Sequence, residues 1–250
     1  MTDFFTAVQT RQHEKNTRIC LGLDPDFRNP QFKSNPQAVL DWATALIEKT
    51  APEICCVKPQ AAFFYALKAD ITADIAEIAH AHELPVILDH KHNDIGSTAA
   101  AYAFGSFDQR KADAITVNAY LGADSVKPFA DYTDKGVFIL ARTSNPSSQD
   151  FQNLDIGGTP LYVHLAETAK SWGNNIGLVV GATQPEAMQH IRAISDAWFL
   201  APGLGAQGGD AASAMKAAAR NIIFPVSRGI AEADDPAKSA RNFRDLINKS

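Results

Sequence analysis

Short apolar runs alternate with amphipathic stretches along the whole chain. Each run is nearly continuous in Val, Ile and Leu, which is typical of parallel strands covered on both faces. Eight such runs predict strands: Ile19–Asp24, Ile54–Lys58, Pro85–Lys91, Ala114–Ala119, Val137–Arg142, Ile176–Gly181, Trp198–Pro202 and Ile222–Arg228.

The stretches between these runs have apolar residues at helical spacing, and many open with Pro or Asp and close near Gly. Eight strand–helix units in 250 residues fit a closed (β/α)8 TIM barrel, although an open doubly wound sheet would show the same alternation. No linker divides the chain, so we predict one domain over residues 1–250. The predicted helices include Pro36–Lys49, Ile71–Glu83, Pro160–Trp172, Pro185–Ser195 and Ala211–Arg220.

Composition and charge narrow the class of protein. A net charge of −5 argues against a nucleic-acid partner, because such proteins neutralise phosphates with basic residues. No apolar run approaches the roughly 20 residues of a membrane helix, and the N-terminal stretch lacks the apolar region of a secretion signal. Cys20, Cys55 and Cys56 lie in apolar runs without CxxC spacing, so we expect reduced thiols, a cytoplasmic location and no membrane partner.

Charged residues stand at the ends of several predicted strands. Isolated strand ends are often polar because strands run out into solvent, but TIM barrels place their active sites at the carboxyl ends. Five charged ends around one mouth therefore predict a site there, formed by Asp24, Lys58, Asp89 with Lys91, Arg142 and Arg228.

The third predicted strand carries the pattern D-x-K-x-x-D. Asp89 and Lys91 share one face of the strand, and His90 points the other way, toward the helical layer. Asp94 follows the strand, where the next helix begins, so we expect it to project away from the Asp89–Lys91 pair. An acidic residue at that place is also typical of a helix cap or of a charge stabilised by the helix dipole.

A glycine-rich turn and an arginine follow the last two predicted strands. Residues 202–210 read PGLGAQGGD and lead into a helix, and Ser227-Arg228-Gly229 follows the eighth strand. Glycine amides, a helix N-terminus and an arginine favour an anion, so we predict a phosphate site. The spacing G-x-G-x-x-G also occurs here, but it follows the seventh strand, and Arg228 stands where a dinucleotide fingerprint has an acid.

His90 and His92 leave a metal-dependent hydrolase open as an alternative. Two imidazoles at this spacing can share a metal, but further ligands are needed. The other five histidines all fall in predicted helices rather than at strand ends: His13, His80, His82, His164 and His190.

Taken together, these motifs resemble orotidine 5′-phosphate decarboxylases, above all the bacterial group with the motif DxKxxDIGxTAAAYA. Residues 89–103 here read DHKHNDIGSTAAAYA. The resemblance implies a TIM barrel that removes CO2 from orotidine 5′-monophosphate (OMP) to give UMP, the last step of de novo pyrimidine synthesis, without metal or organic cofactor. It extends over LGLDPD (21–26), VKPQAAFF (57–64), TVNAYLG (116–122), RTSNPSS (142–148), LVVGAT (178–183), APGLGAQGGD (201–210) and SRGI (227–230).

Carried onto this sequence, the resemblance implies a catalytic array of Lys58, Asp89, Lys91 and Asp94. It further implies a homodimer with shared active sites, in which Asp94, Ile95 and Thr98 reach the partner's site. The residues at the variable positions of the motif, His90, His92 and Asn93, depart from the small or basic residues expected there. The implied substrate contacts are Asp24 with the ribose, Ser144 with the pyrimidine, Gln207 and Arg228 with the phosphate, and Pro202 and Gly203 as pocket lining.

One alternative lies within the same superfamily. Metal-dependent sugar-phosphate decarboxylases and aldolases share D-x-K-x-x-D, but they carry a metal-binding Glu where this chain has Lys58. We also predict that the long polar stretch Ser144–Gly158 closes over the bound substrate, the alternative being a mobile surface loop.

Overall fold

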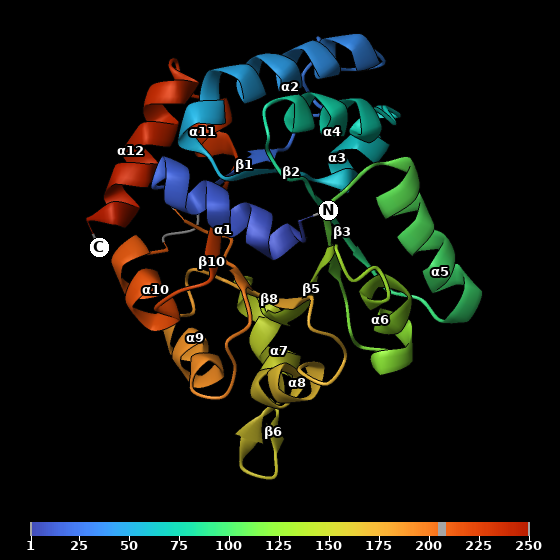
Figure 1. Ribbon diagram of the computed structural model, residues 1–250, viewed down its shortest axis with the longest axis vertical. Helices are drawn as coiled ribbons and strands as arrows, with labels where there is room; N and C mark the ends of the chain where they lie inside the picture. The colour runs from blue at the N-terminus through green and yellow to red at the C-terminus, as the bar shows by residue number, and fades with distance from the viewer. Residues whose placement is uncertain (1, 205–208, 250) are drawn as a thin grey trace.

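Eight parallel strands form a barrel in the computed structural model, which describes residues 2–204 and 209–249 (Figure 1). Each predicted strand is confirmed, with the seventh shortened to two residues. The barrel strands are β1 (Ile19–Leu23), β2 (Cys56–Pro59), β3 (Ile87–His92), β4 (Ala114–Val117), β5 (Gly136–Arg142), β8 (Ile176–Val180), β9 (Phe199–Leu200) and β10 (Ile222–Val226).

The order of the strands shows how the sheet curls into a barrel. It runs β2-β1-β10-β9-β8-β5-β4-β3, so β2 and β3 are its two ends. Isolated parallel bridges, Val57 to Val86 and Gln60 to Asp89, join these ends. The seam is therefore closed by single bridges rather than by a ladder, and the open doubly wound sheet is excluded.

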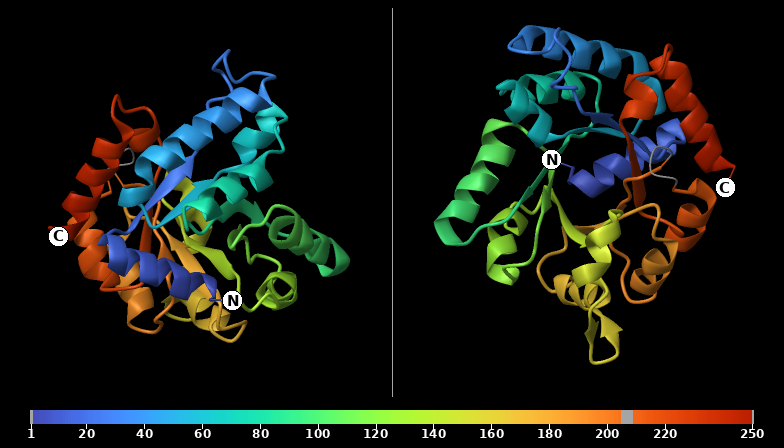
Figure 2. Two further views of the ribbon diagram at one scale, coloured as in Figure 1. Left: turned by 45° about the horizontal axis from the view of Figure 1, so that its top comes forward. Right: turned by 180° about the vertical axis from the view of Figure 1, so that it is seen from behind.

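Helices surround the barrel (Figure 2). The main apolar core lies between the strands and these helices. All five predicted helices are confirmed, with ends that differ from the prediction by at most three residues. The outer helical elements are α2 (Pro36–Thr50), η1 (Ala51–Glu53), α3 (Ala61–Leu67), α4 (Thr72–Ala81), α5 (Gly96–Phe104), η2 (Gly105–Gln109), α6 (Ala123–Ala130), α8 (Leu161–Ala169), α9 (Pro185–Arg192), α10 (Ala211–Ala218), α11 (Arg228–Ala231) and α12 (Pro236–Asn248). Within the described part of the chain, none of these helices has the length and apolar character needed to cross a membrane.

Helix α1 (Phe4–Lys15) covers the amino-terminal mouth of the barrel (Figure 1). Its Phe4 and Val8 join a second apolar cluster with residues that alternate into the barrel interior, such as Cys20 and Phe138. The Phe4 and Phe138 rings meet edge to face with their centroids 5.9 Å apart. This apolar cluster fills the amino-terminal half of the barrel interior. A ligand therefore has room only toward the carboxyl ends of the strands.

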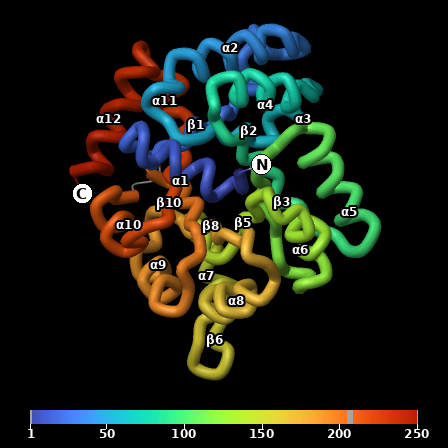
Figure 3. Tube along the Cα trace, in the orientation of Figure 1, coloured from blue at the N-terminus to red at the C-terminus, as the bar shows by residue number. Residues whose placement is uncertain are grey.

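The stretch after β5 forms short elements of its own. It contains η3 (Pro146–Ser148), α7 (Gln149–Gln152) and a hairpin of β6 (Asp155–Ile156) and β7 (Thr159–Pro160). Gly157 and Gly158, with φ of 64° and 91°, form the turn of this hairpin, which projects from the barrel (Figure 3). The stretch Ser144–Gly158 is therefore not one irregular loop, because its Pro and Gly residues favour local turns.

Candidate active site

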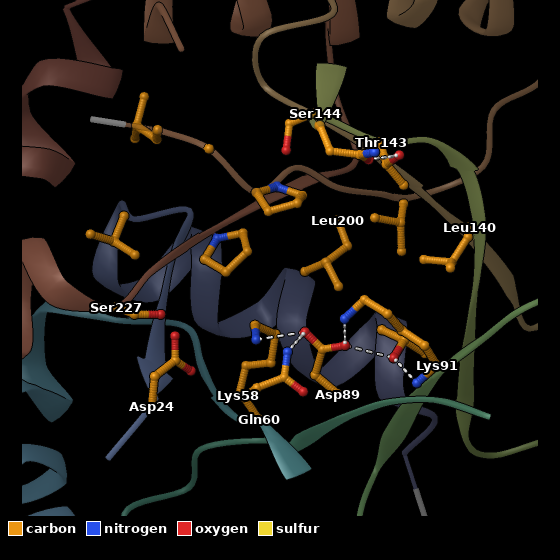
Figure 4. A pocket seen from close by; sticks show the side chains of 18 of the residues that line it. Asp24, Lys58, Gln60, Asp89, Lys91, Leu140, Thr143, Ser144, Leu200 and Ser227 are labelled. Carbon is orange, nitrogen blue, oxygen red and sulfur yellow. Dashed lines mark hydrogen bonds and ion pairs between the residues drawn. The ribbon is translucent and has the colours of Figure 1, made fainter. Parts of the chain in front are cut away.

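A cavity of about 570 Å³ opens at the carboxyl ends of the barrel strands (Figure 4). Its floor is apolar and consists of Leu140, Val179 and Leu200, and the polar residues stand around it. The sequence-predicted residues that line it are Asp24, Lys58, Asp89, Lys91, Ser144, Pro202, Gly203 and Arg228. A cavity thus lies at the strand ends, where the sequence predicts the site. Of the predicted charged strand ends, Arg142 does not line it.

The Asp89 carboxylate lies at the centre of a network of donors from three strands (Figure 4). Its Oδ2 accepts from Lys58 Nζ at 2.8 Å and from the side-chain amide of Gln60 at 3.1 Å. Its Oδ1 contacts Lys91 Nζ and accepts from the Thr116 hydroxyl at 2.8 Å. Asp89 is only 6% exposed, so protein groups rather than water satisfy this carboxylate.

Electrostatics keep both members of the Lys58–Asp89 pair charged. Burial alone would raise the pKa of Asp89, but the positive charges of Lys58 and Lys91 hold it well below its usual value. Burial would likewise lower the pKa of Lys58, but the carboxylates of Asp89 and Asp24 raise it above its usual value. The buried Lys58–Asp89 pair is therefore ionised at neutral pH.

Asp24 has an unsatisfied oxygen at the edge of this network. Its Oδ1 is buried and has no hydrogen-bond partner among the described residues. Because a buried acceptor without a partner is costly, this atom points to a donor supplied by a ligand, such as a hydroxyl.

His90 faces away from the cavity, as the alternation predicts. It lines a separate pocket beside α3, and its Nε2 shares a hydrogen bond with the Tyr65 hydroxyl at 3.2 Å. Its Nδ1 contacts Nε2 of His92, whose ring stacks on Tyr102. No group of three or more His, Cys, Asp or Glu side chains suited to a metal occurs among residues 2–204 and 209–249.

Asp94 stays outside the cavity of its own chain. It follows β3, is half-buried, and accepts the Ile95 amide at 2.8 Å through Oδ1. Ile95, not Asp94, is the N-cap residue of α5, so the cap interpretation of Asp94 is wrong. Ile95 and Thr98 are exposed on the same segment. The structure thus brings Lys58, Asp89 and Lys91 together in one cavity. Asp94 and its neighbours Ile95 and Thr98 lie outside that cavity.

The predicted phosphate end of the cavity is only partly described. Gly203 lines the cavity with φ of 107°, a conformation that favours glycine, and Arg228, which follows β10, lines the same cavity. Asp210 caps α10 by accepting the amides of Ala212 and Ser213. Gln207 lies outside the described residues.

Several lining residues were given no individual role by the sequence analysis: Gln60, Thr116, Asn145 and Gln152. Thr116 had a usable signal, because it is the one hydroxyl inside the apolar run Ala114–Ala119. Gln152 had none, because α7 folds it back onto Thr143, whose backbone amide donates to its side chain at 2.8 Å.

Residues 17–243 match the model of the orotidine 5′-phosphate decarboxylase / HUMPS family. The chain belongs to this family. Its relatives include the orotidine 5′-phosphate decarboxylases of Azoarcus sp. (strain BH72), 43% identical, and Cellvibrio japonicus (strain Ueda107), 44% identical, each covering 98% of both chains. Among solved structures, Leishmania donovani OMP decarboxylase superposes with a TM-score of 0.89 at 38% identity, covering 99% of this chain and 98% of that one. Membership in the orotidine 5′-phosphate decarboxylase / HUMPS family agrees with the barrel and with a site at its carboxyl end.

Proposed function

We propose that this member of the family decarboxylates OMP to UMP and CO2. The observation that carries the proposal is the Asp89 carboxylate held between Lys58 and Lys91 in the cavity. The names of its relatives support the same substrate. The metal-dependent branch is disfavoured because Lys58, a cation, occupies the place of a metal-binding Glu.

In the proposed reaction, the bond between C6 of the pyrimidine and its carboxylate breaks and CO2 leaves. The electron pair stays on C6, where the Lys91 ammonium stabilises it and then donates a proton. Asp89 lies beside the departing carboxylate, so its charge disfavours the bound substrate relative to the transition state. Lys58 and Asp94 keep the array near neutrality, and solvent returns a proton to Lys91.

The remaining contacts follow the shape of a nucleotide. Asp24, with its free Oδ1, binds a ribose hydroxyl, and Ser144 contacts the pyrimidine. Arg228 and Gln207 hold the phosphate, and Pro202 and Gly203 line that end of the pocket. The 144–158 segment closes over the substrate, which its position at the cavity rim supports.

We also propose a homodimer in which Asp94, Ile95 and Thr98 complete the partner's site. An exposed apolar surface next to these residues supports it: Ile95 is 57% exposed, Phe104 52% and Tyr120 85%. Helices α5 and α6 pack side by side beneath this surface. We place the enzyme in the cytoplasm as one domain over residues 1–250, in keeping with its three free, buried cysteines.

Mixing two inactive variants tests the shared site. In the proposed dimer, each active site takes Lys91 from one chain and Asp94 from the other. Lys91→Ala and Asp94→Ala therefore each inactivate a homodimer, but through different chains. After subunit exchange, half of the dimers are mixed and each has one intact site, so about a quarter of wild-type activity returns. No recovery, with exchange verified by mass spectrometry, would contradict the shared site.

Substrate choice tests the activity itself. The EDTA-treated protein should consume OMP, followed by its ultraviolet absorbance, and should leave a phosphorylated ketose unchanged with or without Mg²⁺. Turnover of the ketose only with Mg²⁺ would move the protein to the metal-dependent branch.

A further inference from the structure

The pairing of β3 with β4 is irregular at the catalytic residues. The strands pair Leu88 with Ile115 and then His92 with Val117, so three residues of β3 lie opposite Thr116 alone. Lys91 within this bulge has φ of 56°, which is uncommon and strained for a residue with a side chain. Some contact must therefore hold Lys91 in this conformation.

Thr116 supplies that contact through its side chain. Its hydroxyl accepts the backbone amide of Lys91 at 2.9 Å and donates to Oδ1 of Asp89 at 2.8 Å. A hydroxyl has one proton, and an ionised carboxylate only accepts, so both roles of the hydroxyl are fixed. Thr116 is 1% exposed, and water cannot readily replace it.

We propose that Thr116 is a positioning residue that sets the Lys91 ammonium against the Asp89 carboxylate. This inference rests on the proposed decarboxylase activity. One hydroxyl holds both the backbone of Lys91 and the carboxylate of Asp89. These two hydrogen bonds replace the backbone pairing between β3 and β4 that the bulge interrupts. Without it, the Lys91 amide has no partner and the strained φ can relax, which moves Nζ away from the reacting carbon.

The replacement Thr116→Val separates this role from packing. Valine keeps the branched shape and removes the hydroxyl, whereas Thr116→Ser keeps the hydroxyl. Because small displacements of a catalytic group are costly, we expect Thr116→Val to lower kcat by about 10- to 100-fold. The KM for OMP should change by less than about threefold, since Thr116 acts through Asp89 and Lys91. Thr116→Ser should restore kcat to within about threefold of wild type.

Thr17 offers a matched control at the other end of the barrel. Its hydroxyl is also fully buried, donates to the Glu53 carbonyl at 2.7 Å and accepts the Ile19 amide at 3.2 Å. Thr17→Val should lower the melting temperature about as much as Thr116→Val and leave kcat unchanged. An equal loss of kcat in both variants would mean that the effect is one of stability and would overturn the proposal.

Two further measurements keep the test decisive. If Thr116→Val does not fold, Thr116→Ala against Thr116→Ser gives the same comparison, and an equal kcat in those two would overturn the proposal. A crystal structure of the hydroxyl-free variant should show Lys91 displaced from positive φ. If Lys91 keeps its conformation in that variant, the positioning role is overturned, whatever substrate the wild type acts on. Absence of OMP turnover by the wild type, by contrast, would contradict the proposed function alone.

Discussion

Lys58 Nζ lies 2.8 Å from Oδ2 of Asp89 across the seam between β2 and β3, and each side chain is less than one-tenth exposed. The ion pair thus lies where the barrel is joined by isolated bridges rather than by a ladder. Removing one partner of such a pair leaves a buried charge without compensation. The same two residues therefore serve the proposed chemistry and help to close the barrel.

The charge states of this pair predict a flat pH dependence. The pKa of Asp89 is lowered, so its stabilising contribution is present above about pH 4 and is lost only as the pH falls through that lowered value. The pKa of Lys58 is raised, so its contribution is present below about pH 10 and is lost as the pH rises through the raised value. We expect kcat to be constant within about twofold from pH 5.5 to 9.

Steady-state kinetics with saturating OMP check this expectation. The measurement uses kcat because the substrate phosphate titrates near pH 6 and would affect kcat/KM. A titration of kcat with a midpoint between 6 and 8 would show that a group outside the Lys58–Asp89 pair controls the rate.

The His90–His92 pair predicts sensitivity to acid. Burial, reinforced by nearby positive charge, lowers the pKa of His90 to about 3 and that of His92 to about 4. The unfolded chain takes up these protons near pH 6.5, so stability falls as the pH drops below that value. His92→Gln should lose less of its melting temperature between pH 7.5 and 5 than the wild type. His164→Gln, on the exposed face of α8, is the control, and equal losses in all three proteins would refute the assignment.

Arg142 ties the 144–158 segment to the barrel. Arg142 is 7% exposed, and its guanidinium contacts the Ser148 hydroxyl and donates to the side-chain oxygen of Gln152 at 3.4 Å. Arg142→Met removes these bonds, so we expect kcat/KM to fall about 10-fold, as for the loss of one or two charged hydrogen bonds. Chymotrypsin should also cut faster at Phe151, which is 67% exposed.

An exposed arginine provides the comparison for this variant. Arg220 pairs with Asp196 at the surface, and Arg220→Met should change neither kcat/KM nor the cleavage rate. If Arg142→Met behaves in the same way, the buried arginine does not order the segment.

Glu53 fastens the C-terminal helix to the barrel. Its carboxylate is 6% exposed, accepts from Arg241 Nε at 3.0 Å and contacts Arg244. Glu53→Gln removes the charge from both pairs and should cost about 1.5–3 kcal/mol, or roughly 3–10 °C in melting temperature. Because Glu53 precedes β2 at the amino end of the barrel, kcat should be unchanged. A melting temperature equal to that of the wild type would show that these ion pairs add nothing to stability.

Much of the fold could be predicted from local sequence. Parallel strands buried on both faces produce continuous apolar runs, and these located all eight strands. Closure of the barrel could not be predicted, because the single bridges Val57–Val86 and Gln60–Asp89 leave no local signal.

The site was predictable where side chains follow the alternation of a regular strand, as at Asp89 and His90. It was not predictable where the strand departs from regularity: the bulge at Lys91 gives Thr116 its two hydrogen bonds, and register is a property of two strands together. Residues 144–158 likewise contact Arg142 through Ser148 and Gln152, and no apolar pattern reveals such contacts between polar groups.

The most direct test of the central claim compares wild type with Lys91→Ala by the fall in ultraviolet absorbance of OMP in EDTA. If Lys91 stabilises and protonates C6, the wild type turns OMP over rapidly, and the variant loses at least about 1,000-fold in kcat while still binding UMP. Turnover by Lys91→Ala close to that of the wild type, or no turnover by the folded wild-type protein, would contradict the account.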